Sequence, residues 1–500
     1  MPKFTEIALD PASELPFYKQ LAESIRGLID CGLIQPGEKL PATRELAGQL
    51  GLNRTTVSAA YAQLEQCGLL QGHVGRGSFV ARPEMANAAP AARSTDGPAL
   101  DWDEILPPLE PQGASARNHR ISFANSRPSE HAFPLAEFRR LAREVIDSAE
   151  AADILQLGSA YGYGPLRRYL LERAVEAGTA RVADDLLITN GCQQALDLLA
   201  RLFAADGQKV LMEDPVYHGL SRVFQRAGAA IVPVPVDDQG VDADAVEALL
   251  HQHRPRVLVV TPNFQNPTGG TLPLERRQRI VALAQRFGVV LIENDVYGEL
   301  RYEGRDLPPL KQLDETGNTI LLRSYSKVSF PGLRVGWVIA PRPVISRLAD
   351  AKQLCDLHSD QLSQAVLLRF AESGELARHL ERTRRAGAQR LRAALSACTH
   401  YLPQGAKFTR PEGGMNFWIE LPAPLTAQAL LPRVEEQGVT FLPGSFFSAG
   451  RPHPRGIRIS FGSLDADEIR QGLRVIGEAA RAALKTAESE VNWQPAAALV

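Results

Sequence analysis

The stretch that decides the fold reads Ser324-Tyr325-Ser326-Lys327, with Pro331-Gly332 and Arg334 close behind it. The amine of Lys327 can form an imine with an aldehyde. The serine hydroxyls can hold a phosphate group, and the planar guanidinium of Arg334 can pair with that phosphate through two hydrogen bonds. Together these groups meet the requirement for holding pyridoxal phosphate through a Schiff base. The segment therefore predicts a site for this cofactor.

Around this segment, from about residue 121 onward, buried strands and helices alternate. Apolar runs typical of buried parallel strands occur at 210–212, 257–260 and 289–292. Helical stretches lie between them, at 193–204 and 274–287. This alternation predicts an α/β domain of several hundred residues with a mainly parallel sheet.

The first eighty residues follow a different pattern. Apolar residues recur at helical spacing between residues 17 and 29. Thr43 and Asn53 are expected to cap two further helices, and Gly51 and Gly68 are expected to end them. Three short helices in close succession are therefore predicted near the start of the chain.

A β-ribbon is predicted directly after these helices, because Leu69-Leu70 and Phe79-Val80 flank the turn Gly75-Arg76-Gly77. Three helices followed by such a ribbon make a winged helix-turn-helix, whose third helix enters the major groove of DNA. Arg44, at the start of the second helix, is expected to reach a phosphate or a base, and Arg76 lies at the wing tip. The residues expected to face base edges open the third helix: Asn53, Arg54, Thr55 and Thr56.

Charge supports this DNA-binding interpretation locally. The whole chain has a formal net charge of -2, so no global field attracts it to nucleic acid. Between Lys39 and Arg82, however, there are five Lys or Arg residues and two Glu residues, a net of +3. Binding through such a surface releases counterions from DNA and weakens steeply with salt.

Length and composition indicate a globular protein of several domains. The chain has 500 residues, too many for one core, and is 44% hydrophobic and 22% charged. Residues 82–118 are rich in Pro, Ala, Ser and Gly and predict a linker. The expected divisions are a DNA-binding domain at 1–81, the linker at 82–118, a large domain at 119–485 and a tail at 486–500.

The five cysteines are scattered and lack CxxC spacing, so they indicate free thiols in a reducing compartment rather than a disulfide framework or a metal site. The N-terminal residues do not begin a signal peptide, and no apolar run is long enough to span a bilayer. We therefore expect a soluble cytoplasmic protein that uses no metal and no membrane.

Motifs in both regions resemble known families. The run Pro36-Gly37, Leu40-Pro41, Arg54-Thr55-Thr56-Val57 and Gly75-Arg76-Gly77-Ser78-Phe79-Val80 is similar to the GntR-type winged helix. Residues from about 121 to 480 resemble the fold-type I aminotransferases, through Asn190-Gly191-Cys192-Gln193, Asp214-Pro215-Val216-Tyr217, Asn266-Pro267-Thr268-Gly269 and the lysine segment.

The aminotransferase resemblance implies a role for each matching residue. Gly191, Cys192 and Gln193, ahead of a helix, would cradle the cofactor phosphate with their N–H groups. Ser324, Ser326 and Arg334 would bind the same phosphate. The remaining expected contacts are stacking on the pyridine ring by Tyr217, hydrogen bonds to the ring hydroxyl from Asn266 and Tyr297, the Schiff base at Lys327, and pairing of a substrate α-carboxylate with Arg458.

Three positions depart from the family pattern. Asn294 stands where an aspartate normally pairs with the pyridine nitrogen, and it supplies no charge. Asp295 could take that role if the strand end is shifted by one residue, although strand alternation points its side chain the other way. Leu157 replaces a tyrosine that reaches the neighbouring subunit, where Tyr161 or Tyr163 could compensate. Asn125-Ser126 replaces a pair of glycines at the substrate carboxylate.

A GntR-type head, a linker and an aminotransferase-like domain, in this order, resemble the MocR-type transcriptional regulators. The resemblance implies a homodimer that binds double-stranded DNA and senses an amino compound, or pyridoxal phosphate itself, through Schiff-base chemistry at Lys327. The weaker electron sink at Asn294 favours such a sensor. The alternatives are an active aminotransferase that carries a regulatory head, and a DNA-binding scaffold with a cofactor-free domain.

Overall fold

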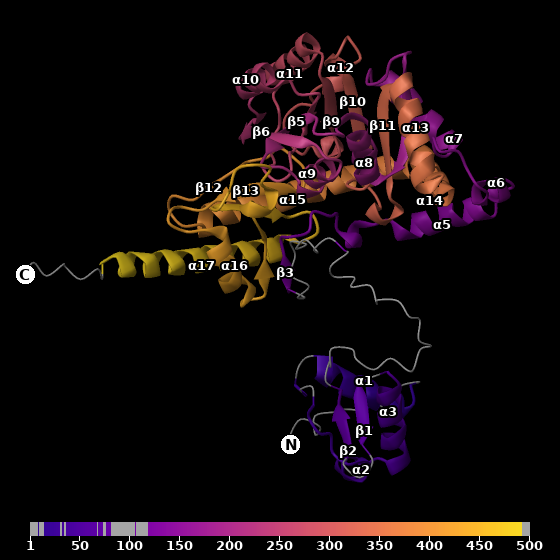
Figure 1. Cartoon of the computed structure of the whole chain (residues 1–500), viewed down its shortest axis with the longest axis vertical. Coiled ribbons are helices and arrows are strands. Elements are labelled where there is room, and N and C mark those ends of the chain that lie inside the picture. Colours follow the sequence, from indigo (N-terminus) through magenta and orange to yellow (C-terminus); the bar gives the residue numbers. More distant parts are fainter. Residues whose placement is uncertain are drawn as a thin grey trace, which may run out of the picture. The chain divides into compact units, whose positions relative to one another are not determined.

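The computed structural model describes residues 9, 15–30, 33–34, 37–67, 69–73, 77–81, 106 and 119–492. The chain divides into two compact units, Met1–Glu110 and Pro111–Val500 (Figure 1). Most of the expected linker lies outside the described residues.

The first unit is the expected arrangement of three helices and a ribbon. Its apolar residues at helical spacing, such as Leu21, Ile25 and Val57, meet in one core. The ribbon strands pair antiparallel, with Leu70 opposite Val80. The elements are α1 (Phe17–Asp30), α2 (Thr43–Leu50), α3 (Arg54–Gln66), β1 (Leu70–His73) and β2 (Gly77–Val80).

The helix ends in this unit follow local chemistry, with one exception. Gly51 ends α2 in the left-handed conformation, with φ of 64°, as expected of a C-terminal glycine. The Asn53 side chain caps α3 by accepting a hydrogen bond from the Thr55 N–H at 3.2 Å. The prediction that Thr43 caps α2 was wrong, because Ala42 is the N-cap and Thr43 is already helical. Gly68 lies outside the described residues.

The second unit is built on an eight-stranded sheet with the order β4-β11-β10-β9-β8-β5-β6-β7. Its five middle strands, from β10 to β6, run parallel. β11 is antiparallel to both neighbours, and the short β7 is antiparallel to β6. This confirms the mainly parallel sheet. The strands are β4 (Asp184–Asn190), β5 (Lys209–Asp214), β6 (Ala230–Asp237), β7 (Gly240–Val241), β8 (Val257–Val260), β9 (Val290–Asn294), β10 (Thr319–Ser324) and β11 (Val335–Pro341).

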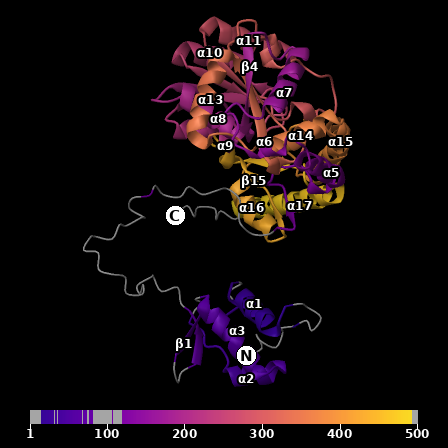
Figure 2. The ribbon, with the colours of Figure 1, turned by 90° about the vertical axis from the view of Figure 1, so that its right-hand side faces the viewer.

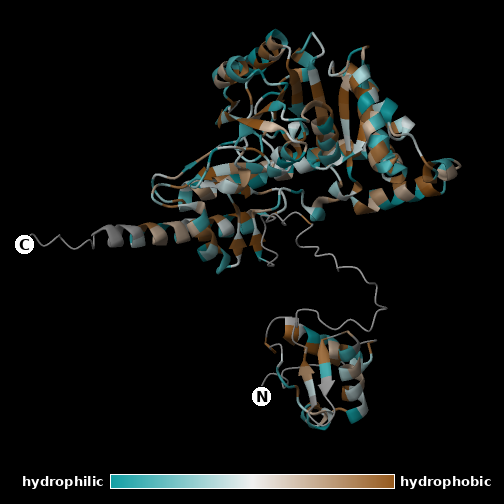
Figure 3. Ribbon diagram, viewed as in Figure 1, coloured by the Kyte–Doolittle hydropathy of each residue, from teal (hydrophilic) through white to brown (hydrophobic). Residues whose placement is uncertain are grey.

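Helices cover both faces of this sheet, as the continuous apolar character of its strands requires. The strands are mostly brown in Figure 3, the hydrophobic end of the scale. In Figure 2, α8 (Gly191–Phe203), α9 (His218–Arg226) and α13 (Arg342–Asp356) lie on one side, while α7 (Gly164–Glu176) and α14 (Gln361–Glu372) lie on the other. The second side also carries α10 (Ala243–His253), α11 (Leu274–Phe287) and α12 (Leu310–Leu313).

A smaller lobe completes the unit. Its four-stranded sheet has the order β12-β13-β16-β15. The lobe has its own core, which includes Phe123, Phe417, Ile459 and Leu473. Its elements are β3 (Ile121–Ser122), β12 (Lys407–Phe408), β13 (Asn416–Glu420), α16 (Ala427–Glu435), β14 (Val439–Thr440), β15 (Leu442–Pro443), β16 (Gly456–Ser460) and α17 (Ala466–Asn492). The long α15 (Glu375–Tyr401) packs against α17, whereas α5 (Leu135–Ile146) and α6 (Ala151–Leu155) pack against α14.

Within the described part of the chain, short 3-10 helices occur in connections: η2 (Glu130–Ala132), η3 (Gly298–Leu300), η4 (Pro331–Leu333) and η5 (Gly444–Phe447). α17 continues beyond residue 485, where the large domain was expected to end. None of the described helices combines the length and the apolar character needed to cross a membrane.

Candidate functional site

A cavity of about 310 Å³ lies where the carboxyl ends of β9 and β10 meet the start of α8 and the small lobe. Parallel strands bring their carboxyl ends to one edge of the sheet, which explains why distant residues converge there. We call it the cofactor cavity. Eleven of the residues predicted from the sequence line it: Cys192, Gln193, Tyr217, Asn266, Asn294, Tyr297, Ser324, Ser326, Lys327, Arg334 and Arg458.

The cofactor cavity is strongly cationic. Lys327, Arg334 and Arg458 line it, and no Asp or Glu is found among its described lining residues. Three positive charges without a carboxylate favour an anionic ligand with more than one charged group.

Arg458, on β16, is a buried cation that lacks a carboxylate partner among the described residues. Its Nη2 donates to the carbonyl of Ala124, its Nη1 lies 3.5 Å from Asn266 Oδ1, and its Nε has no hydrogen-bond partner. The guanidinium stands 5.0 Å from the centroid of the Phe447 ring. Burial lowers the pKa of Arg458 to about 10. A carboxylate that entered the cavity would relieve this unpaired charge.

Lys327 lies beside Tyr297. The lysine Nζ donates to the carbonyl of Ser126 at 2.6 Å and is 5.5 Å from the centroid of the tyrosine ring. The Tyr297 hydroxyl is 3.2 Å from Ser126 Oγ and 3.5 Å from the amides of Asn266 and Asn416. Burial alone would raise the pKa of Tyr297, but the Lys327 charge, the Ser126 hydrogen bond and Arg458 together lower it. The hydroxyl is therefore a good hydrogen-bond partner for an anionic oxygen.

Oxygen-binding groups gather around the start of α8. The helix begins at Gly191, two residues before the stretch 193–204 that the sequence predicts. Gly191 therefore belongs to the helix N-terminus, which attracts anions. Gly191 has φ of 73°, and a Cβ there would stand 2.9 Å from Cζ of Arg334. Arg334 Nη1 lies 3.5 Å from Ser326 Oγ, which accepts a hydrogen bond from Ser324 Oγ at 2.9 Å. These groups form a cradle of suitable chemistry for a phosphate.

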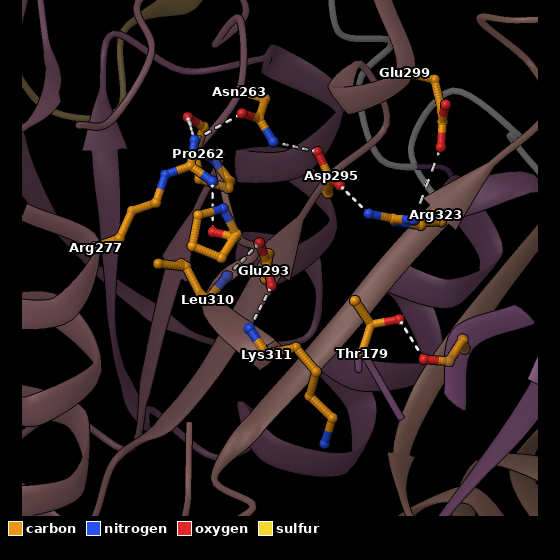
Figure 4. A network of polar contacts seen from close by, with 12 residues as sticks. Thr179, Pro262, Asn263, Arg277, Glu293, Asp295, Glu299, Leu310, Lys311 and Arg323 are labelled. Atoms are coloured by element: carbon orange, nitrogen blue, oxygen red, sulfur yellow. Dashed lines mark hydrogen bonds and ion pairs between the residues drawn. The ribbon is translucent and has the colours of Figure 1, made fainter. Parts of the chain in front are cut away.

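Of the two candidates for the pyridine nitrogen, Asn294 faces the cofactor cavity and Asp295 does not. Asn294 Oδ1 is buried without a hydrogen-bond partner. Asp295 accepts from Asn263 Nδ2 at 2.8 Å and pairs with Arg323 Nη2 at 2.9 Å on the other side of the strands (Figure 4). Strand alternation explains the difference. The cavity therefore presents a neutral carboxamide at this position.

Of the other positions that depart from the family pattern, one pair lines the cofactor cavity and one residue lies outside it. Asn125 and Ser126 line the cavity. Leu157 lies outside it, with 73% of its surface exposed. The centroid of the Tyr161 ring lies 5.2 Å from Cζ of Arg167, and Tyr163 packs against the core beneath α7. Neither tyrosine lines the cofactor cavity of its own chain.

Sequence reasoning missed an aromatic wall. Phe446 and Phe447, from η5 of the small lobe, line the cavity together with Leu442. The Val216 N–H donates to the Phe447 carbonyl at 2.8 Å, next to Tyr217 at the rim. An aromatic pair in a connection carries no distinctive sequence signal, so only the fold reveals this contact.

The residues expected to contact DNA lie on α2 and at the start of α3. Arg44, Asn53, Arg54 and Thr55 are exposed, and Thr56 is half-buried. Arg76 lies outside the described residues. Asn53, Arg54 and Thr55 are thus exposed at the N-terminal end of α3, the helix that a winged helix-turn-helix inserts into the major groove.

Two family models match the chain. The model for aminotransferase class I and II matches residues 128–476, and the model for bacterial regulatory proteins of the gntR family matches residues 17–80.

Curated relatives fall into two groups. A 2-aminoadipate transaminase of Thermus thermophilus is 37% identical over 368 residues, which cover 73% of this chain and 91% of the relative. An uncharacterised HTH-type transcriptional regulator of Escherichia coli, YjiR, is 30% identical over 475 residues, 94% of this chain and 99% of the relative. The probable rhizopine catabolism regulatory protein MocR of Rhizobium meliloti is 28% identical and covers 95% of both chains.

Solved structures agree with the fold of the second unit. The α-aminoadipate aminotransferase LysN of Thermus thermophilus, solved with N-(5'-phosphopyridoxyl)-L-leucine, has a TM-score of 0.71 and 34% sequence identity. The match covers 77% of this chain and 100% of LysN. Proteins of this fold depend on pyridoxal phosphate.

Proposed function

Because the chain belongs to the aminotransferase class I and II family and carries a gntR-family domain before it, as MocR-like transcriptional regulators do, we propose that it is a DNA-binding regulator whose cofactor cavity senses an amino compound. The observation that carries this proposal is the cationic cofactor cavity on the same chain as a winged helix-turn-helix. In this proposal, residues 1–81 read DNA, 82–118 are a linker, and 119–485 bind the effector in the cytoplasm.

Pyridoxal phosphate fits the cofactor cavity. The cradle at Gly191, Ser326 and Arg334 suits its phosphate, and the unpartnered Oδ1 of Asn294 is available to the ring. When bound, the cofactor supplies an aldehyde that condenses reversibly with a primary amine. Lys327 is the amine of the chain that lines the cavity.

The other residues of the chain would orient the ligand. Tyr297 and Asn266 would hydrogen-bond the ring hydroxyl, and the aromatic ring of Tyr217 would cover one ring face. Arg458 would take a carboxylate, since it is buried without an acidic partner. The effector would therefore carry both an amine and a carboxylate.

Asn294 favours sensing over turnover. An aspartate at this position would keep a proton on the ring nitrogen through its charge, whereas a neutral carboxamide cannot. Without that charge, the ring is a weaker electron sink, so proton removal from a bound amino compound would be slow. Such a ligand would stay bound long enough to report its concentration.

A homodimer is part of the proposal, because an exposed apolar patch lies near the cavity. Leu155 is the last residue of α6 and Leu157 follows the helix, while Leu354 and Leu357 lie at the end of α13. Gln361, four residues after Leu357 at the start of α14, donates from Nε2 to the carbonyls of Ile154 and Gln156, so the connection that follows α13 lies against the end of α6. Large apolar side chains gathered on a surface favour a protein interface. A dimer would also carry two DNA-binding domains, one for each half-site of a DNA target.

The deciding experiment follows cofactor absorbance and DNA affinity together. The purified chain, loaded with pyridoxal phosphate, would be titrated with a panel of amino acids and amines, in the presence of labelled DNA from upstream of its own gene. We expect one compound to shift the absorbance band and DNA affinity at the same concentration, without product. Lys327→Ala should remove both responses, whereas Lys209→Ala, an exposed lysine on β5, should keep them.

The rival function is that of an aminotransferase with a regulatory head, which the Thermus thermophilus relative favours. That function requires multiple turnovers with an amino donor and a keto acid acceptor. Sustained keto acid production with DNA affinity unchanged would overturn the regulator proposal.

A further inference from the structure

A second cavity, of about 480 Å³, lies on the opposite side of β9 and β10 from the cofactor cavity. We call it the rear cavity. The sheet forms its floor, α7 forms one wall, and the junction of α14 and α15 forms the other. Its lining includes Leu170, Arg173, Arg323, Trp337, Leu376 and Leu380.

Two arginines, Arg173 and Arg323, and two carboxylates, Asp295 and Glu299, line the rear cavity. Arg323 pairs with Asp295 at 2.9 Å, and Arg384 pairs with Glu299 at 3.0 Å (Figure 4 shows Asp295, Arg323 and Glu299). Arg173, at the mouth, has its guanidinium 5.7 Å from the centroid of the Tyr169 ring and no carboxylate partner among the described residues. Both lining carboxylates are therefore paired with an arginine, and Arg173 is the lining cation that remains for an anionic ligand.

Arg323 has hydrogen-bonding capacity to spare. Its Nη2 is used by Asp295, and its Nη1 is 3.9 Å from a Glu299 oxygen. Its Nε is buried without a hydrogen-bond partner. Leaving a buried donor of a charged group unsatisfied is costly, so an acceptor at this point would be favourable.

The rest of the rear cavity is apolar. Leu170, Leu376 and Leu380 line it with several alanines, and Trp337 contributes an aromatic surface backed by Tyr325, with the ring centroids 4.9 Å apart. These walls suit an aliphatic or aromatic group of modest size.

We propose that the rear cavity binds a small monocarboxylate with an aliphatic or aromatic body. The carboxylate accepts hydrogen bonds from Arg323 and Arg173, and the body packs against Trp337 and Leu380. One negative charge would pair with Arg173, whereas a second one would meet the carboxylates of Asp295 and Glu299, which argues against a dicarboxylate.

The rear cavity shares a wall with the cofactor cavity. Ser324, Tyr325 and Val328 face the rear cavity, whereas Ser324, Ser326 and Lys327 line the cofactor cavity. The turn between them is tight, since the Tyr325 carbonyl accepts from the Val328 and Ser329 N–H groups at 3.2 and 2.8 Å. An acid in the rear cavity therefore changes the position of Lys327. This coupling rests on the proposed function, whereas the binding itself does not.

Calorimetric titration of the full chain, loaded with pyridoxal phosphate, tests the site directly with hexanoate and indole-3-acetate as probes. We expect saturable binding of at least one probe. Ala377→Trp, which places a bulky ring in the rear cavity, should weaken it about tenfold or more, equivalent to ~1.4 kcal/mol. Arg458→Lys, in the cofactor cavity, should leave probe affinity within about twofold, a difference of ~0.4 kcal/mol.

Two results would overturn the proposal. One is the absence of saturable binding by either probe. The other is binding that survives Ala377→Trp but is lost in Arg458→Lys, because the acid would then occupy the cofactor cavity. If Ala377→Trp does not fold, Arg173→Gln replaces it, with the same tenfold expectation. No DNA is present, so failure here is distinct from failure of the regulator proposal.

Discussion

The carboxylate of Asp214, at the end of β5, accepts a hydrogen bond from Nε2 of His453 in the small lobe, at 3.0 Å. This contact joins the two lobes. The same carboxylate accepts from the N–H groups of Ala449 and Arg451, at 2.9 and 2.8 Å. The loop that it fastens follows Phe446 and Phe447, which line the cofactor cavity. One carboxylate on the large lobe therefore holds the aromatic wall of the cavity in place.

Asp214→Asn should destabilise the protein in a pH-dependent way. Burial alone would raise the pKa of Asp214, but the hydrogen bonds from His453, Ala449 and Arg451 outweigh it and lower the pKa below its ordinary value of 3.8. A lowered carboxyl pKa contributes stability above the ordinary value, and this is lost as pH falls through the folded value.

Urea unfolding of the native chain and of Asp214→Asn measures this contribution. We expect a loss of about 1.5–3 kcal/mol near neutral pH, since the hydrogen bonds go to a charged group. The difference should shrink as the pH falls below 3.8, the ordinary pKa of the carboxyl group. Asp467→Asn, an exposed partner of Arg470, is the control and should cost less than about 1 kcal/mol. A difference that stays constant with pH would contradict the assignment.

Gly191→Ala should weaken retention of pyridoxal phosphate. The added Cβ would crowd Arg334, and φ of 73° disfavours alanine by about 1 kcal/mol. We expect cofactor affinity to fall at least about tenfold, measured by absorbance after ultrafiltration. Gly164→Ala is the matched control, because Gly164 also opens a helix, but a Cβ added there would come no closer than 3.8 Å to Arg168. Equal retention in both variants would argue against the cradle.

Leu354→Glu should disrupt the proposed dimer. Leu354 is 90% exposed in the single chain, within the apolar patch beside α6. A charge at the centre of an interface costs several kcal/mol through desolvation, so dissociation is expected at micromolar concentration. Light scattering after size exclusion gives the mass. Val182→Glu, also exposed but outside the patch, should leave the mass unchanged. A dimer that persists in Leu354→Glu would place the interface elsewhere.

Asn294→Asp should raise transaminase turnover. The new carboxylate would face the cofactor ring and keep a proton on its nitrogen, which strengthens the electron sink. We expect at least about a tenfold faster formation of keto acid, which corresponds to ~1.4 kcal/mol of barrier. Asp295→Asn is the control, since Asp295 binds Asn263 and Arg323 outside the cavity and should alter stability rather than turnover. An unchanged rate in Asn294→Asp would show that the ring nitrogen does not limit the reaction.

The Asn294 and Asp295 pair also illustrates how far the sequence alone reaches. Alternation along β9 favoured Asn294 as the residue in the cavity, and the structure agrees. The sequence could not settle the matter, because shifting the strand end by one residue exchanges the two faces. The periodicity of apolar residues was sufficient to predict the sheet and most helices, because it follows directly from which residues are buried.

What the sequence did not reveal depends on long-range packing. Phe446 and Phe447 reach the cofactor cavity through a loop of the small lobe that is fastened by Asp214. The rear cavity combines α7, the sheet and the start of α15, and each contributes residues that read as ordinary core or surface. Thr43 was mistaken for a cap because Thr is common both at N-caps and in the first turn, and only backbone dihedrals distinguish these positions.

Arg458→Met should separate stability from ligand binding. Burial without an acidic partner lowers the pKa of Arg458 to about 10, so the guanidinium is still charged at neutral pH, but this charge is less favourable in the folded chain than in the unfolded chain. The unfolded chain binds more protons above about pH 10, and stability should rise with pH there. Replacing the guanidinium with an apolar side chain of similar length should raise the free energy of unfolding by about 1–2 kcal/mol at neutral pH, even after loss of the contacts to Ala124 and Asn266.

The same variant should lose the thermal stabilisation that an amino acid effector gives the native chain, because the carboxylate of the effector no longer has a partner. Thermal unfolding with and without effector measures both effects. A variant that is less stable without ligand, yet still stabilised by the effector, would mean that Arg458 serves the fold and that the carboxylate binds elsewhere.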